Sequence, residues 1–259
     1  MKILITGASR GIGFQITKDL LVEKNKLILQ CNKNQKKIKK YLKENNYKAE
    51  VVQVDLSSPN GVEELFNKTI EKIGFPDAIV NNAGIAESAY IEEPFFSWSE
   101  MFDKTISVNL KAPALICKEF IYKKRKEKIQ NRLRIVNISS RAAFRGDEED
   151  FISYACSKGG LISLTKTITR AFGKKDNVLA FSIAPGFVNT EMAKDFIAQH
   201  GEGHAKKGIV LNKLTEPKDV SSVVSFVILT LFITSFILSL IISLFFSQKS
   251  VVIYSTFPA

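Results

Sequence analysis

Two side chains four positions apart, Tyr154 and Lys158, form the pair in this sequence best suited to proton transfer. On a helix, residues i and i+4 lie on one face, so we expect both to point into the same space. A phenol normally loses its proton only near pH ~10. A neighbouring ammonium favours the phenolate, so Lys158 should lower the pKa of Tyr154 and make it a general acid or base at neutral pH. Alone, this spacing more often describes a solvated helix face, and its meaning depends on the rest of the chain.

The N-terminal segment has the pattern of a phosphate-binding loop. An apolar run over residues 1–6 stops at Gly7, and a helical pattern starts by Ile12. Strand, tight turn and helix is the context that such a loop requires. Gly7 permits the turn, Gly11 lets a pyrophosphate approach the backbone, and Gly13 allows the helix to pack closely on the strand. The helix N-terminus then offers N–H groups and partial positive charge to phosphate. The alternative is an ordinary strand–helix turn.

Further motifs follow predicted strands or lie within a predicted helix, and they settle that choice. They are Asn81-Asn82-Ala83-Gly84 after strand 78–80, Ser107-Val108-Asn109 in mid-helix, Ser139-Ser140 at the end of strand 134–138, and Pro185-Gly186 after 180–184, with Thr190 beyond. Together with the glycine loop and the Tyr/Lys pair, they resemble the short-chain dehydrogenase/reductase family in order and spacing. The resemblance covers residues 1 to about 222. It implies a Rossmann-type α/β fold, a doubly wound parallel sheet in a single domain, and the alternation of strands with helical stretches argues for the same.

The resemblance implies a catalytic tetrad of Asn109, Ser140, Tyr154 and Lys158. Ser140 would hydrogen-bond the substrate carbonyl oxygen, and Tyr154 would give that oxygen its proton as hydride arrives from a nicotinamide. Lys158 would bind the nicotinamide ribose, and Asn109 would hold a water that links Lys158 to solvent. Ser139 is the alternative to Ser140. The acidic loop over residues 146–150 is expected to be a solvated turn.

The same resemblance implies a set of dinucleotide-binding residues. They are Gly7, Ser9, Arg10, Gly11, Ile12, Gly13, Asn32, Lys33, Asp55, Leu56, Asn82, Ala83, Gly84, Tyr154, Lys158, Pro185, Gly186, Val188 and Thr190. An acid at the end of the second strand, residues 26–31, would bind a ribose 2′-hydroxyl and repel a 2′-phosphate. Asn32-Lys33-Asn34 follows that strand instead. We therefore predict NADP(H) over NAD(H), with Arg10 and Lys33 as phosphate binders, although Lys33 could also belong to a generally lysine-rich surface.

The amino-acid composition limits the classes of binding partner that we expect. The chain of 259 residues carries a formal charge of +11, but its basic residues are scattered instead of forming a stripe with aromatics, so we expect no nucleic acid. The densest basic cluster, residues 123–126 with Lys128, Arg132 and Arg134, is expected to be a solvated face, and binding of an acidic carrier protein or an anionic membrane there stays open.

Cys31, Cys117 and Cys156 show no paired spacing, which fits a reducing cytoplasm, and Cys156 is expected to pack. No metal motif is present, and His200 and His204 are expected in a lid over the substrate.

The C-terminal tail departs from the family. Residues 221–247 consist only of Ser, Val, Phe, Ile, Leu and Thr. As a helix, residues 223–246 would be about 36 Å long, enough to cross a hydrocarbon core about 30 Å thick. This divides the chain into a catalytic domain (1–222), a candidate transmembrane helix (223–246) and a short tail (247–259). A frame-shifted end is the alternative. The last sheet strand is in doubt, although residues 251–254 could still form one.

The resulting functional prediction is an NADPH-dependent carbonyl reductase of the short-chain family, most like the bacterial 3-oxoacyl-carrier-protein reductases. Its substrate would be a small molecule or an acyl group on a carrier protein, and the family leads us to expect a homo-oligomer. Two alternatives stay open. One is a reductase of another ketone, such as a sugar, steroid or polyketide unit. The other is a non-catalytic relative that binds a dinucleotide without turnover, because the tail is altered.

Overall fold

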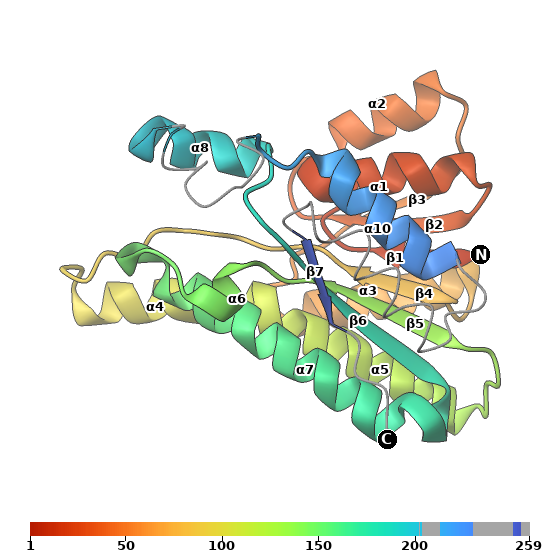
Figure 1. Cartoon of the computed structure of the whole chain (residues 1–259). Helices are drawn as coiled ribbons and strands as arrows, with labels where there is room; N and C mark the ends of the chain where they lie inside the picture. The colour runs from red at the N-terminus through yellow and green to blue at the C-terminus, as the bar shows by residue number, and fades with distance from the viewer. Residues whose placement is uncertain (202, 204–212, 230–250, 255–259) are drawn as a thin grey trace.

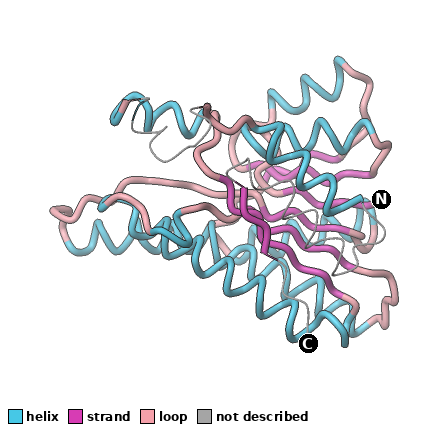
Figure 2. The backbone as a smooth tube through the Cα atoms, viewed as in Figure 1, coloured by secondary structure: helices cyan, strands magenta, loops and turns pink. Residues whose placement is uncertain are grey.

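A computed structural model of the chain describes residues 1–201, 203, 213–229 and 251–254. A seven-stranded sheet lies in the middle of the molecule, with the order β3-β2-β1-β4-β5-β6-β7 (Figures 1 and 2). The strands are β1 (Lys2–Ile5), β2 (Lys26–Cys31), β3 (Glu50–Gln53), β4 (Ala78–Asn81), β5 (Leu133–Ile138), β6 (Val178–Pro185) and β7 (Val251–Tyr254). The first six are parallel. From β1 the chain adds β2 and β3 on one side, and it then returns to add β4, β5 and β6 on the other side. The predicted Rossmann-type sheet is confirmed for these six strands.

Helices cover both faces of the sheet because alternate strand residues point to opposite sides. Ile3 and Ile5 pack toward α1 (Gly11–Val22), α2 (Lys36–Glu44) and α10 (Pro217–Leu229). Leu4 packs on the other side with α3 (Pro59–Ile73), α5 (Ala112–Lys126) and α7 (Ile152–Asp176). Figure 1 shows these two layers on opposite sides of the sheet. Parallel strands enclosed in this way are buried on both faces, which explains their continuous apolar sequences.

The remaining elements lie at the carboxyl ends of the strands or connect the main helices. They are α4 (Phe95–Ile106), the π-helical segment η1 (Ser107–Lys111), α6 (Ala142–Arg145), the 3₁₀ segment η2 (Glu149–Phe151) and α8 (Glu191–His200). Helix α4 continues through η1 into α5, so these form one long helix with a π turn inside it. π turns within helices are frequent at functional sites.

The seventh strand, which the sequence left in doubt, adds an antiparallel edge to the predicted parallel sheet. Strand β7 forms at the suggested residues 251–254, but it runs antiparallel to β6, with Val251 opposite Pro185 and Tyr254 opposite Ser182. An antiparallel edge strand on a parallel sheet is common in large mixed sheets.

Helix α10 packs the beginning of the apolar tail onto the domain. Val220, Val224, Val227 and Ile228 are fully buried against α1 and the sheet. The predicted boundary between residues 222 and 223 thus lies inside α10, while residues 230–246 of the candidate transmembrane segment lie outside the described residues. Within the described part of the chain, no helix has both the length and the apolar character needed to cross a membrane.

Candidate active site

The glycine loop between β1 and α1 depends on the absence of side chains at two of its glycines. Gly7 has a φ of +65°, and a Cβ there would lie 2.8 Å from the Ala83 Cα. A Cβ on Gly13 would lie 2.2 Å from the Gly7 carbonyl oxygen. The loop therefore folds back tightly on the first turn of α1, which leaves the N-terminal N–H groups of that helix at the carboxyl edge of the sheet. This is a cradle that a diphosphate fits.

The side chains of Thr6, Asn82 and Gln30 hold this loop in place, and only Asn82 was predicted at the site. The Thr6 hydroxyl oxygen accepts hydrogen bonds from the backbone N–H groups of Asn82 and Ala83, both at 3.0 Å. The Asn82 amide donates to the carbonyl oxygens of Thr6 (3.0 Å) and Gly7 (3.1 Å). Buried Gln30 accepts from Gly7 N–H (2.9 Å) and donates to the Val54 carbonyl oxygen (2.9 Å). Sequence reasoning missed Thr6 and Gln30, because nothing in their local pattern indicates a partner so far away in the chain.

The residues predicted at the adenine end follow strands β2 and β3. Asn32, Lys33 and Arg10 are exposed, and within the described residues neither Lys33 nor Arg10 takes part in an ion pair. Asp55 is exposed as well and accepts a hydrogen bond from Ser57 N–H (2.9 Å). The Leu56 side chain is 5% exposed and belongs to the core, so only its backbone could contact a ligand.

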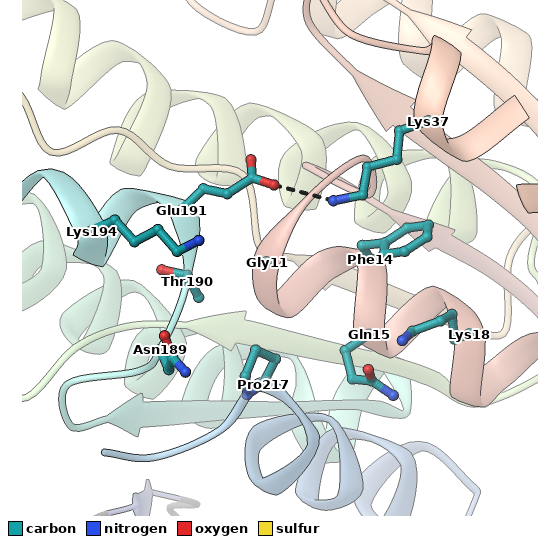
Figure 3. Close-up of a pocket in the computed structure, with 10 residues that line it drawn as sticks. All are labelled: Gly11, Phe14, Gln15, Lys18, Lys37, Asn189, Thr190, Glu191, Lys194 and Pro217. Atoms are coloured by element: carbon teal, nitrogen blue, oxygen red, sulfur yellow. Dashed lines mark hydrogen bonds and ion pairs between the residues drawn. The ribbon is translucent and has the colours of Figure 1, made fainter. Parts of the chain in front are cut away.

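A pocket of about 430 Å³ opens beside Gly11 and Thr190, between the starts of α1, α8 and α10 (Figure 3). Its walls include Phe14, Gln15, Lys18, Lys37, Asn189, Glu191, Lys194 and Pro217. Lys37 of α2 reaches across to Glu191 of α8 at 3.1 Å. Three lysines and one carboxylate give the pocket a net positive lining, which suits an anion.

The segment after β6 reaches this pocket from the other side. Pro185 ends β6, and Val188 is buried and forms an isolated bridge with Thr215. Thr190 caps α8, because its hydroxyl accepts from Ala193 N–H at 3.3 Å. A Cβ on Gly11 would lie 3.3 Å from the Thr190 Cγ2. The predicted cofactor residues of the glycine loop and of the segment after β6 therefore meet.

Helix α7 brings the predicted catalytic side chains together. Lys158 is 4% exposed, and its Nζ lies 5.6 Å from the centroid of the Tyr154 ring. Ser140, after β5, hydrogen-bonds Tyr154. The Ser139 hydroxyl instead donates to the Lys158 carbonyl oxygen at 2.9 Å, which leaves it a structural role. This geometry favours Ser140 over Ser139.

Burial changes the titration of this pair. It raises the pKa of Tyr154, and the hydrogen bond with Ser140 only partly opposes that effect. Burial also lowers the pKa of Lys158 to about 8. Both shifts disfavour the charged form, as expected for groups removed from water. The shift of the Tyr154 pKa is therefore opposite in direction to the expected lowering, because desolvation is its largest cause.

Asn109 lies in η1 and faces Lys158 across Gly84. A Cβ on Gly84 would lie 3.3 Å from the Asn109 Oδ1 and 3.4 Å from the Lys158 Nζ. The Asn109 amide donates to the Ile85 carbonyl oxygen (2.8 Å) and to the Ser157 Oγ (3.1 Å), and its oxygen accepts from Ile85 N–H (2.9 Å). Asn109 thus fixes the strand-end segment next to the Tyr/Lys pair, while its water-holding role stays a prediction.

Other expectations are corrected or refined. Asp147 is not in a solvated turn: its side chain is only 18% exposed, and its charge acts on Tyr154. Cys156 is exposed instead of packed, because it lies on the outer face of α7.

In the basic cluster, Lys124 is buried and donates to the carbonyl oxygens of Ile129 and Asn131, and Arg125 pairs with Asp176 at 2.7 Å. His200 ends α8, whereas His204 lies outside the described residues.

Comparisons with known proteins point to one family. A family model described as short chain dehydrogenase matches residues 1–201. The chain is 30% identical over 229 residues to the 3-oxoacyl-[acyl-carrier-protein] reductase of Aquifex aeolicus, covering 86% of this chain and 88% of that protein. It is 34% identical over 225 residues to the reductase of the same name from Rickettsia typhi, covering 86% and 87%. A solved structure of 4-hydroxyisoleucine dehydrogenase complexed with NADH is similar with a TM-score of 0.78 at 30% identity, covering 88% of this chain and 90% of that one.

Proposed function

The chain belongs to the short-chain dehydrogenase family, and from that premise we propose that it reduces 3-oxoacyl thioesters to 3-hydroxyacyl thioesters with NADPH. It is an oxidoreductase that acts on CH–OH groups, and it is similar to 3-oxoacyl-[acyl-carrier-protein] reductases. The observation that carries the proposal is the convergence of Ser140, Tyr154 and Lys158 beside the glycine loop. A carrier-protein-bound acyl group and a homo-oligomeric enzyme are part of the same proposal.

In this mechanism the chain binds, orients and protonates the substrate. When bound, the nicotinamide supplies a hydride to the carbonyl carbon. Ser140 donates a hydrogen bond to the carbonyl oxygen, and Tyr154 gives its phenolic proton to that oxygen as charge develops on it. Burial raises the pKa of Tyr154, so the phenol carries its proton at neutral pH. Lys158 lies 5.6 Å from the ring centroid and stabilises the phenolate that remains.

The preference for NADPH is supported by the charges around the glycine loop. Arg10 in the glycine loop and Lys33 after β2 are both exposed and would bind the 2′-phosphate, and no carboxylate follows β2 until Glu44. Lys18, Lys37 and Lys194 add positive charge to the adjacent pocket. These positive charges would stabilise the bound 2′-phosphate of NADPH, whereas the uncharged ribose 2′-hydroxyl of NADH would gain no such charge-assisted hydrogen bonds.

A direct assay tests this proposal. The full chain is supplied with acetoacetyl-CoA and either NADPH or NADH, and loss of reduced cofactor is followed. We expect turnover with a higher kcat/KM for NADPH, and Lys33→Asp should narrow the gap between the two cofactors. A preference for NADH in the unaltered protein would contradict the 2′-phosphate assignment. Cofactor binding without turnover of any ketone would favour the non-catalytic alternative.

A further inference from the structure

Lys194 lies one helical turn after Thr190, on the same face at the start of α8. The Thr190 Cγ2 lies 3.3 Å from where a Cβ on Gly11 would be, so the start of α8 packs against the glycine loop. Residues i and i+4 of a helix are neighbours, and long side chains lean toward the N-terminus of their own helix. Lys194 accordingly lines the same pocket as Gly11, and Figure 3 shows its ammonium directed into that pocket.

No residue within the described part of the chain forms an ion pair with Lys194. The carboxylate next to it on α8, Glu191, is paired with Lys37 at 3.1 Å. A second carboxylate, Glu216, accepts a hydrogen bond from the Asn189 amide at 3.2 Å and lies at the start of α10. The Lys194 ammonium is therefore left for a partner that this part of the chain does not supply.

The other charges around the pocket do not reverse this excess of positive charge. Lys18 also lines the pocket, and its Nζ lies 5.4 Å from the centroid of the Phe14 ring. Asp19, the next residue on α1, is paired with Lys218 at 2.8 Å. The first turns of α1, α8 and α10 meet at the pocket, and helix N-termini carry partial positive charge. The pocket therefore favours a ligand with more than one negative charge.

We propose that Lys194 binds the diphosphate of the dinucleotide, so that α8 and the glycine loop hold it from two sides. The inference rests on the proposed cofactor and adds a residue outside the predicted set. The diphosphate is common to NADPH and NADH, and it would lie at the N-terminus of α1, where Gly11 meets Thr190. An ammonium there supplies a charge-assisted hydrogen bond to a phosphate oxygen. Arg10 and Lys33 would bind the 2′-phosphate, which only NADPH carries.

The ion pair between Lys37 and Glu191 supports the same site. An unpaired Glu191 carboxylate would repel a diphosphate in this pocket, and Lys37 offsets that charge. Both side chains are about half exposed, so the pair itself adds little to the stability of the fold. Its effect should appear in cofactor affinity instead. Lys37→Met should raise the Kd of NADH, and adding Glu191→Gln to that variant should lower the Kd again.

The test measures binding without turnover, by fluorescence titration with NADPH and NADH and by competition with two fragments. ADP-ribose contains the diphosphate but no 2′-phosphate, and 2′-AMP contains the 2′-phosphate but no diphosphate. We expect Lys194→Met to raise the Kd of NADPH, NADH and ADP-ribose at least about fivefold and to leave that of 2′-AMP unchanged. Lys194→Arg should recover most of the affinity, because it restores the charge. The control Lys174→Met, in the last turn of α7, should change none of these values.

Two results would overturn the inference. One is an unchanged Kd for NADH and ADP-ribose in Lys194→Met, and the other is a loss confined to NADPH and 2′-AMP, which would assign Lys194 to the 2′-phosphate. Lys194 is exposed, so unfolding by urea should be the same in the variant and the unaltered protein. Failure of the unaltered protein to bind NADPH, NADH or ADP-ribose would instead count against the proposed cofactor itself.

Discussion

At the scale of single residues, Tyr154 and Lys158 both lose contact with water on folding, and this desolvation raises the pKa of Tyr154 and lowers the pKa of Lys158. The phenol keeps its proton more firmly, and the ammonium loses its proton more easily. For a reductase this is a useful resting state, because the proton donor is loaded before the substrate arrives. Lys158 then carries its charge below about pH 8. Desolvation thus sets the titration of this pair, in which Lys158 is buried and Tyr154 is half-buried.

The first prediction concerns the proton on Tyr154. Tyr154→Phe removes only the hydroxyl, so we expect carbonyl reduction to fall by about two orders of magnitude or more. Affinity for NADPH, measured by fluorescence titration, should stay within a few fold, because the ring still packs. Turnover in the Phe variant close to that of the unaltered enzyme would remove Tyr154 from the mechanism.

A second prediction follows from the Lys158 ammonium. Its folded pKa of about 8 lies below the ordinary lysine value of 10.5, so the unfolded chain holds more protons between these two pH values. Burial of the charge therefore costs stability below pH 8, and that cost disappears as the pH rises. Between pH 8 and pH 10 the free energy of unfolding should rise by ~2 kcal/mol relative to Lys158→Met. Urea unfolding of the unaltered protein and of Lys158→Met, both without ligand, measures this difference. If the unfolding free energies of the two proteins changed equally with pH, the lysine would be solvated in the folded state.

At the scale of elements, the turn from β1 into α1 depends on Gly13. A Cβ there would lie 2.4 Å from the Asn82 Nδ2 as well as 2.2 Å from the Gly7 carbonyl oxygen. Gly13→Ala should therefore displace the loop and weaken NADPH binding at least about tenfold. The matched control is Gly173→Ala in α7, where the nearest atom is 3.6 Å away. That change should leave binding intact and add up to about 1 kcal/mol of stability through helix propensity. Equal effects on cofactor binding would contradict the packing argument.

Asp19 fastens α1 to α10. It accepts hydrogen bonds from the Ser221 Oγ (2.6 Å) and the Lys218 Nζ (2.8 Å). Although burial alone would raise the pKa of Asp19, hydrogen bonds from Lys218, Ser221 and Gln15 lower it. The carboxylate therefore adds stability above the unfolded pKa of about 3.9, and this stability is lost as the pH falls further.

Asp19→Asn should cost about 1 kcal/mol of unfolding free energy at pH 7. The difference from the unaltered protein should persist to about pH 5 and shrink below about pH 4. Urea titrations at several pH values measure this change. A difference that does not depend on pH would assign the effect to lost packing instead of lost charge.

The six parallel strands could be predicted within two residues because buried strands are continuous apolar runs bounded by glycine, asparagine and proline. The direction of β7 relative to β6 could not be predicted, because a run of four apolar residues fits a parallel and an antiparallel strand equally well. Among site residues, motif spacing found the Tyr/Lys pair and the glycine loop. It missed Thr6 and Gln30, because their partners lie in distant segments that come together only when the sheet is assembled. It also missed the burial of Asp147, because its local pattern is that of an exposed acidic turn.

At the scale of the whole molecule, the three cysteines should report folding. Cys117 is buried, and burial raises its pKa to about 12. Burial also raises the pKa of Cys31. Cys156 is exposed on α7. Because the thiolate is the reactive form, a disulfide reagent should modify one thiol quickly in the native protein and all three after unfolding. Three fast thiols in the native state would contradict the packing of α5 and β2.

The hydrogen bonds of Thr6 and Asn82 join the ends of β1 and β4, where the chain reverses its direction of winding. A dinucleotide bound over this junction would hold the two halves of the sheet together from outside. Mass action then adds about 2.7 kcal/mol when free cofactor is about one hundred times its Kd. The fraction of molecules open to a protease would fall accordingly, so the lifetime of the enzyme in a cell should follow its supply of reduced cofactor.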